Sequence, residues 1–218
     1  MQLSLRHGQR LFSILVLLGV GCGAFNTSAY GVREHSNPFA GASRSALVLV
    51  VPLDAHARSL VRSTLPAIKR WLPSDQLLSI APMPGVGVDA SRGEVDYSQL
   101  GQALLTEFQQ AQGTRPVLVM AVSSNAVFDS SSPQLSFVFG GYVWQGQQYA
   151  AVFGTRPMRV YQPQLEKTRL TKFMLRYIGE IVCGLSPSSD PTSVTYSPIM
   201  GTPDLDRMVP TLPSSCHH

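Results

Sequence analysis

Residues 170–186 read LTKFMLRYIGEIVCGLS, and this stretch decides which fold the sequence predicts. Its apolar residues recur at helical spacing, at Leu170, Phe173, Met174, Tyr177, Ile178, Ile181, Val182 and Leu185. Such a stripe is typical of a helix that packs against a core, so we predict a helix over 167–185. Lys172, Arg176 and Glu180 follow one another at intervals of four residues and form a separate polar stripe.

The segments on either side of this helix come in a definite order. Before it stand a short strand, SFVFG at 136–140, and a second strand, YAAVF at 149–153, which leads to Arg156. After it come a turn, SPIMG at 197–201, and the acidic segment Asp204–Leu205–Asp206. We therefore predict a β-hairpin, the long helix and a methionine-containing turn, in this order along the chain.

This order resembles that of the archaemetzincin family of the metzincin proteases. Residues 47–54 and 92–97 are also similar to the family's first strand and to the stretch before its second helix, so the likeness covers roughly residues 46–209. In the metzincin motif H-E-x-x-H-x-x-G-x-x-H, histidines on one helical face and beyond the glycine bind zinc, and the glutamate acts as general base. The resemblance implies a metzincin-like fold and, where the motif is intact, a zinc peptidase.

The motif itself is degenerate in this chain. In the register that fits best, Arg176 and Tyr177 stand where H-E would be, and Glu180 stands where the second histidine would be. Gly179 keeps the glycine of the H-E-x-G-H form, and Gly184 ends the helix one residue later than the motif requires. A second register, anchored on Gly184, offers instead Tyr177, Ile178, Ile181 and Pro187. Neither set of side chains can hold zinc.

The histidines lie away from the helix, at His7, His35, His56, His217 and His218. A site with three histidines on the helix is therefore excluded. The terminal pair, together with Cys216, lies at a chain end that offers an ion no fixed geometry. We expect no metal and no cofactor, and we expect Met200 and its turn to support the helix by packing only.

The composition is that of one folded domain. The chain has 218 residues, of which 44% are hydrophobic and 14% charged. Strand and helix patterns alternate along it, which together with the resemblance implies an α/β (α+β) fold. We expect a single metzincin-like domain at 46–210, followed by a flexible tail at 211–218. Its sheet should be twisted, mixed and mostly parallel, with about four to five strands, an antiparallel hairpin at one edge and two or three packed helices.

The remaining elements follow from local patterns. We predict strands over 46–53, 76–80 and 116–122, helices over 55–71 and 97–110, and a hairpin of 137–142 with 149–153. Asp54 can cap the first helix, and Pro66 should kink that helix or shift its start. Residues 81–91, rich in proline and glycine, read as a loop.

The N-terminus has the pattern of an export signal. Arg6 and Arg10 precede an apolar run at 11–20 that is too short to span a membrane, and small residues follow. We therefore expect a signal peptide at 1–29 and a flexible linker at 30–45.

Two processing routes stay open for this signal. A signal peptidase can cut after Ala24 or Ala29, whereas Gly21–Cys22 resembles the end of a lipoprotein box, although Gly19 stands where that box usually has leucine. In the second route, a lipid on Cys22 anchors the protein to the outer membrane. Either route predicts a periplasmic or secreted protein.

Export changes the meaning of the cysteines, because disulfides persist outside the cytoplasm. If Cys22 is removed or acylated, Cys183 and Cys216 remain as a pair that can tie the end of the last helix to the tail. The alternative is that Cys183 is a small buried apolar residue and Cys216 a free thiol. Both interpretations remain open.

Basic residues, interrupted only by Glu166, gather before and within the long helix: Arg156, Arg159, Lys167, Arg169, Lys172 and Arg176. No interleaved aromatics and no nucleic-acid motif accompany them, so nucleic acid is not an expected partner. They read either as a solvated helix face or as a surface for an acidic protein or an anionic lipid head group. Candidate interaction residues are Arg169, Lys172, Arg176 and Glu180. Arg176 and Glu180 can also form an ion pair, either in the vacated metal position or exposed to solvent.

Two classes of function remain. The first is an exported, non-catalytic pseudo-metzincin that acts as a protein-interaction or scaffold module, for example in a cell-envelope assembly, and binds a peptide along the strand at 137–142. Its membrane contact would come only from a lipid on Cys22. The second is a hydrolase that uses Glu180 with Asp204 or Asp206 as an acid pair. We favour the first, because no complete catalytic set can be named and the two aspartates also fit as caps of a short helix.

Overall fold

A computed structural model of the chain describes residues 46–72, 77–79, 88–89, 93–112, 117–130 and 138–216. These residues belong to one compact unit, Ser36–His218. The signal peptide and linker expected at 1–45, with Cys22, and the terminal histidines 217–218 lie outside the described residues. In the described part of the chain, no helix is long and apolar enough to cross a membrane.

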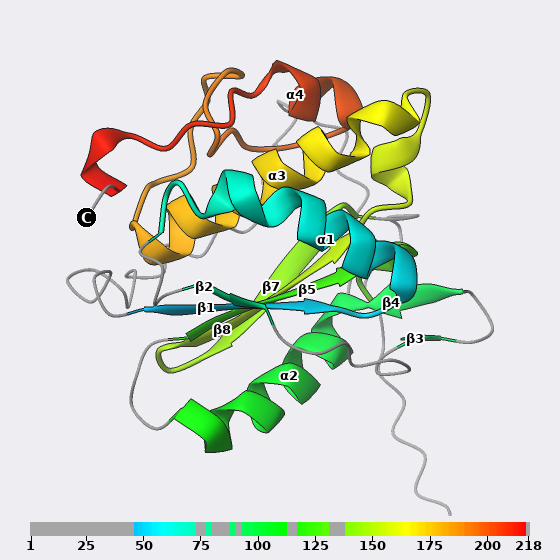
Figure 1. Cartoon of the computed structure of the whole chain (residues 1–218), viewed down its shortest axis with the longest axis vertical. Coiled ribbons are helices and arrows are strands. Elements are labelled where there is room, and N and C mark those ends of the chain that lie inside the picture. The colour runs from blue at the N-terminus through cyan, green and yellow to red at the C-terminus, as the bar shows by residue number, and fades with distance from the viewer. Residues whose placement is uncertain are drawn as a thin grey trace, which may run out of the picture. The chain divides into compact units, whose positions relative to one another are not determined.

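The main sheet has five strands, which confirms the mixed, mostly parallel sheet that the sequence predicts. In order across the sheet they are β2 (Leu77–Ser79), β1 (Leu47–Pro52), β5 (Val117–Ser123), β8 (Gln148–Gly154) and β7 (Gly140–Gln145). The first four run parallel, and β7 is antiparallel to β8 (Figure 1). The antiparallel hairpin therefore forms one edge of the sheet.

A second, smaller sheet is absent from the sequence-based prediction. It consists of β3 (Val88–Asp89), β4 (Glu94–Asp96) and β6 (Ala126–Phe128), with β3 antiparallel and β6 parallel to β4. Strands of two or three residues are too short to show an alternation of polar and apolar residues, which is why local patterns miss them.

Helices cover both faces of the main sheet. The helices α1 (Ala55–Ile68) and α3 (Glu166–Tyr177) lie on one face, and α2 (Tyr97–Gln112) lies on the other (Figure 1). Alternate residues of each central strand therefore enter two different cores, as in β1, where Val48 faces α1 and α3 while Leu49 faces α2. Because both faces are buried, β1 and β5 are apolar almost throughout, as parallel strands of this kind usually are.

The start of α1 is fixed by the predicted cap. The Asp54 carboxylate accepts a hydrogen bond from the backbone N–H of Ala57 at 2.8 Å. Its other oxygen accepts one from Ser124 N–H at 2.7 Å, which joins the helix start to the end of β5. Pro66 lies inside this helix and does not shift its start, which is Ala55. The helix ends at Ile68 instead of 71, and Lys69 N–H donates to Leu65 C=O at 2.9 Å.

The hairpin at the edge lies further along the chain than predicted. Its first strand is Gly140–Gln145 instead of 137–142, and Gln145 pairs with Gln148 across a two-residue turn. Gly146 has φ +59° at the first turn position, the position that a type II′ hairpin turn reserves for glycine. This turn sets the register, and Phe139 before the strand packs edge-on against Phe173 with ring centres 6.1 Å apart.

The C-terminal segment packs against α3 and does not form the flexible tail predicted for 211–218. After the helix α4 (Thr202–Arg207), the chain turns back and ends in a 3-10 turn, η5 (Ser214–Cys216). Leu212 and Cys216 are both buried. Leu212 lies close above Gly179, where a Cβ would come within 2.9 Å of the leucine side chain. Gly179 is therefore needed for this close approach, as its expected structural role implies.

Candidate functional site

The long helix predicted over 167–185 changes its winding at the degenerate motif. The α-helix α3 ends at Tyr177, and the π-helix η4 (Ile178–Val182) continues it, with Cys183 N–H donating to Ile178 C=O at 3.0 Å. Gly184 then adopts φ +69° and ends the helix, as expected from the sequence. A π-helical turn is rare, and such turns occur frequently at functional sites. This part of the helix is therefore a candidate functional site.

Arg176 and Glu180 form an ion pair across this change in winding. Arg176 Nε lies 2.8 Å from Glu180 Oε1, and each side chain is only 14% exposed. Arg176 also lies over the ring of Phe173, at 6.0 Å from its centre. The pair is thus largely withdrawn from water, unlike an ordinary surface pair. Burial raises the pKa of the Glu180 carboxyl above its usual range, although the Arg176 charge opposes the shift.

Tyr177, beside Arg176, lies at the centre of an aromatic cluster. Its ring centre is 5.2 Å from that of Phe153, 5.3 Å from that of Phe173 and 5.6 Å from that of Tyr142. The rings meet mostly edge to face, an arrangement that stabilises a core. Burial raises the pKa of the Tyr177 hydroxyl far above its usual range, so the phenol stays neutral.

Tyr142 connects this cluster to the edge strand β7. Its pKa is raised by burial and by the negative charge of Glu180, which places the hydroxyl within electrostatic reach of the Arg176–Glu180 pair. Its ring also contacts Trp144 and Tyr149, both at 6.0 Å between ring centres. The edge strand, the aromatic cluster and the ion pair therefore form one continuous site.

The side chains at the motif positions do not fit a zinc ion. The guanidinium of Arg176 is permanently protonated and offers only donors. Tyr177 is neutral and buried among other rings, and one oxygen of Glu180 already binds Arg176. Across the described residues, no group of three or more His, Cys, Asp and Glu side chains comes together as a metal site.

Arg169 and Lys172 are buried, which corrects their interpretation as interaction residues. Arg169 binds the Asp206 carboxylate through two hydrogen bonds of 2.6 and 2.7 Å and donates to the carbonyl of Met158 at 2.7 Å. Lys172 Nζ donates to the carbonyls of Leu205 and Asp206 at 2.8 and 2.9 Å. Both cations thus hold the end of α4 and the segment before α3 inside the fold and are not available to a partner.

The two aspartates after the methionine turn have structural partners of their own. Asp204 accepts hydrogen bonds from Met200 N–H at 2.7 Å and Gly201 N–H at 3.2 Å, and it pairs with Arg207. It therefore fixes the start of α4, while Asp206 binds Arg169. The carboxylate pairing with Glu180 that a hydrolase would need is not formed. Met200 itself is 71% exposed, so the packing role expected of it falls to Ile199, which packs against the core.

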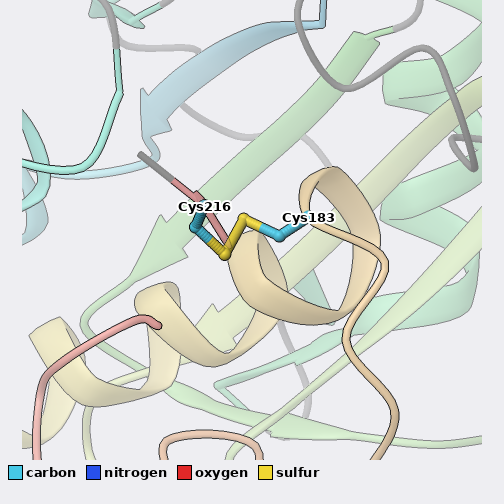
Figure 2. The surroundings of a disulfide bond; sticks show 2 residues. All are labelled: Cys183 and Cys216. Atoms are coloured by element: carbon cyan, nitrogen blue, oxygen red, sulfur yellow. A yellow bond between two sulfur atoms is a disulfide. The ribbon is translucent and has the colours of Figure 1, made fainter. Parts of the chain in front are cut away.

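A disulfide joins Cys183, at the end of η4, to Cys216 in η5 (Figure 2). The two Cα atoms are 5.4 Å apart, and the residues are separated by 33 positions in the sequence. The bond fixes the C-terminal segment against the end of the motif helix. The sequence leaves open whether Cys183 and Cys216 are bonded or free, and in the structure they form a disulfide.

One cluster of ionisable side chains has no counterpart in the sequence analysis. His56 Nε2, at the start of α1, lies 3.1 Å from both oxygens of the buried Glu166 carboxylate at the start of α3. Arg159 Nε lies 3.4 Å from the same carboxylate. His56 and Glu166 are 110 positions apart, so no local pattern could have brought them together.

Solved structures of archaemetzincins share this fold. Archaemetzincin from Methanopyrus kandleri superposes with a TM-score of 0.55 at 21% identity, covering 79% of this chain and 92% of that one. A zinc-dependent peptidase from Methanocorpusculum labreanum gives 0.58 at 16% identity, covering 78% and 97%. Archaemetzincin from Archaeoglobus fulgidus gives 0.52 at 18% identity, covering 78% and 96%. At these identities the likeness establishes the fold alone.

No protein-family model and no curated protein matches the chain.

Proposed function

We propose that this protein is a non-catalytic member of the archaemetzincin-like fold that binds an extended segment of a protein partner along the edge strand β7. The observation that carries the proposal is the Arg176–Glu180 ion pair, which occupies the motif positions where a peptidase of this fold would hold zinc. A cation that neutralises the glutamate from within the chain takes over the electrostatic role of a metal and leaves no open coordination position.

The edge strand supports peptide binding. Gln145 and Gln148, next to the two-residue turn, exchange both backbone hydrogen bonds, so alternate residues of β7 point their N–H and C=O groups away from β8. These are Gly140, Tyr142 and Trp144. No strand among the described residues pairs with this side of β7, so the N–H and C=O groups of Gly140 and Tyr142 can pair with an added strand.

Aromatic side chains at this edge would supply the specificity. Trp144 is 42% exposed, and Tyr142 is half-buried between Trp144 and the aromatic cluster. Rigid aromatic rings along this edge suit a peptide with bulky apolar side chains at alternate positions. A basic side chain of the peptide would also find the Glu180 carboxylate nearby.

The proposed setting is outside the cytoplasm, as a module of a cell-envelope assembly. The export pattern of residues 1–29 supports this setting, as does the disulfide between Cys183 and Cys216, because such bonds persist in oxidising compartments. Anchoring through a lipid on Cys22 stays a prediction. Mass spectrometry of the protein exported from a cell would identify the processed N-terminus directly.

The test of peptide binding uses two variants of one residue. A random-peptide phage library is selected against the mature protein, and the best peptide is synthesised and titrated. Tyr142→Ala removes the ring but keeps the outward N–H, whereas Tyr142→Pro removes both. We expect Tyr142→Pro to bind the peptide about fivefold more weakly than Tyr142→Ala, the effect of about one lost hydrogen bond. Equal affinities of the two variants would refute strand addition at this edge.

A hydrolase built on Glu180 is the second candidate, and the raised pKa of this buried carboxyl favours it, because perturbed acids gather in active sites. Glu180→Gln separates the two functions. If the protein cleaves the selected peptide and this variant abolishes cleavage, the protein is an enzyme. We expect the peptide to stay intact with both the parent and the variant.

A further inference from the structure

Tyr161 is an unusually exposed aromatic residue. Its side chain is 93% exposed, and the neighbouring Val160 is 42% exposed. Both lie between two 3-10 turns, η2 (Pro157–Arg159) and η3 (Pro163–Leu165), in a segment that leads from β8 to α3. We call residues 156–162 the Tyr161 loop. Exposed apolar side chains are common on protein surfaces, so it is the backbone of Tyr161 that sets this position apart.

The backbone of Tyr161 is strained. Its φ is +65°, a conformation that a bulky residue rarely adopts, and Gln162 N–H donates to Val160 C=O at 2.9 Å across it. A hydrogen bond between residues two apart with a positive φ at the centre defines the rare, strained form of the γ-turn. Such strain persists only where the surroundings enforce it, and it is found mainly at functional sites.

Arg169 supplies that enforcement from the interior. Its guanidinium donates to the carbonyls of Met158 and Val160 at 2.7 and 3.2 Å, and its other side binds the Asp206 carboxylate. Only 2% of the Arg169 side chain is exposed. The Tyr161 loop is therefore a rigid protrusion, held from below by a buried cation.

The loop and its surroundings carry an excess of positive charge. Arg156 and Lys167 are exposed and Arg159 is partly exposed, whereas Glu166 is the only acidic residue in 156–168. Glu166 is buried and its charge is neutralised by Arg159 and faced by His56. The exposed surface around Tyr161 thus combines one protruding ring, one aliphatic side chain and cations.

We propose that the Tyr161 loop docks the protein onto an anionic bilayer surface. The ring of Tyr161 lies at the level of the lipid head groups, where amphipathic aromatic side chains are favoured, and Val160 enters beside it. Arg156 and Lys167 bind the lipid phosphates, whereas Arg159 is engaged with Glu166 and with the carbonyl of Ser124. This contact uses residues other than those of the edge strand β7 and does not depend on peptide binding there.

The shape of the loop favours a bilayer over a protein partner. A stable protein interface needs on the order of 800 Å² from each partner, with a hydrophobic centre. Two protruding side chains between cations are too few for such a centre. A fluid interface, in contrast, closes around a convex loop without a complementary pocket, and it supplies the phosphates that the cations require.

The experiment measures sedimentation of the disulfide-bonded protein with vesicles made of equal parts phosphatidylcholine and phosphatidylglycerol. We expect salt-sensitive binding that is weaker on phosphatidylcholine alone. Tyr161→Gly should lower the affinity by at least about fivefold while the melting temperature stays equal or rises. The matched control is Arg58→Gln/Arg62→Gln, which removes two exposed charges from α1 but leaves the loop intact. This control should lose less affinity than Tyr161→Gly.

A second variant reports the position of the side chain directly. Lipids with brominated chains should quench the tryptophan fluorescence of Tyr161→Trp. The quenching should exceed that of the parent, whose fluorescence comes from Trp71 and Trp144 alone. No binding of the parent to anionic vesicles would overturn the proposal. Equal affinity of Tyr161→Gly and the parent for anionic vesicles would also overturn it. So would a loss of affinity in the α1 control as large as that in Tyr161→Gly. In either case diffuse charge alone would explain the binding. Peptide binding at β7 should be unchanged in all three variants.

Discussion

Arg169 has one of the largest fully buried side chains among the described residues, and its guanidinium joins two segments: it binds Asp206 in α4 and the carbonyls of Met158 and Val160 in the Tyr161 loop. A buried cation is stabilising only while its partners stay in place. Lys172, next on the same helix, depends in the same way on the carbonyls of Leu205 and Asp206, and burial lowers its pKa. The basic residues of α3 therefore hold the second half of the chain together.

Removing the counter-charge of Arg169 should be costly. We expect Asp206→Ala to lower the free energy of unfolding by about 3 kcal/mol, because it leaves a buried guanidinium without an anion. Urea denaturation would measure the change. Glu107→Ala, which removes an exposed carboxylate from α2, should leave the stability unchanged, and equal effects of the two substitutions would argue against the buried pair.

Two of the carboxyls with shifted pKa values, Glu180 and Asp206, predict opposite pH dependences in separate ranges. Burial raises the pKa of Glu180 above 4.5, so the folded state holds this proton more tightly and stability falls as the pH rises through the raised value. Relative to the parent, Glu180→Gln should therefore gain stability as the pH rises above 4.5. The hydrogen bond from Arg169 lowers the pKa of Asp206 below 3.8, so its contribution is present above 3.8 and lost on further acidification. Urea denaturation across this pH range would show both trends, and a pH-independent difference for Glu180→Gln would contradict the first.

The strain at Tyr161 has its own consequence for stability. Tyr161→Gly should raise the free energy of unfolding by about 1 kcal/mol, because glycine adopts a positive φ without steric conflict. Tyr161→Ala keeps the Cβ that causes the strain and should give no such gain. Thermal unfolding of both variants would measure these changes in stability. An increase in the alanine variant as large as in the glycine variant would show that loss of the tyrosine side chain, and not relief of the backbone strain, raises the stability.

At the scale of elements, the motif helix and the C-terminal segment form one unit. The helix passes from α3 into the π-helix η4, and Cys183 at its end is bonded to Cys216. Leu212 packs against Gly179 between these two points. The C-terminal segment thus covers the helix at the degenerate motif and keeps its unusual winding in place.

The disulfide should account for much of the stability of this unit. Closing a loop of 33 residues in the unfolded chain corresponds to about 3–4 kcal/mol. We expect Cys216→Ser and Cys183→Ser to lower the free energy of unfolding by similar amounts. The double variant should be no less stable than either single variant, because each removes the same bond. Additive losses in the double variant would show that the two sulfurs act separately.

The elements with long periodic patterns were predictable, and the short ones were not. The apolar runs of β1 and β5 and the stripes of α1, α2 and α3 come from repeats of one local pattern. The strands β4 and β6 and the π-helical turn span too few residues for any pattern. The burial of Arg169 and the pairing of His56 with Glu166 depend on segments far apart in the sequence, and only the folded chain brings them together.

At the scale of the whole described unit, the sheet separates two hydrophobic cores. Helices α1 and α3 cover the face that carries the motif helix, and α2 covers the opposite face (Figure 1). The edge strand β7 links them, since Tyr142 packs with the first core and Val143 with the second. The described unit shares its fold with the solved archaemetzincins, and its helix carries the Arg176–Glu180 ion pair beside an aromatic cluster.

Zinc content tests most directly whether the motif helix binds a metal. The mature protein, without a histidine tag and with His217 and His218 deleted, is incubated with zinc, dialysed against metal-free buffer and analysed by mass spectrometry of the metal. We expect zinc well below one ion per chain, equal in the parent and in Glu180→Gln. One zinc retained per chain of the parent, and lost in Glu180→Gln, would show that the motif helix still holds a metal and that the protein has to be treated as a peptidase.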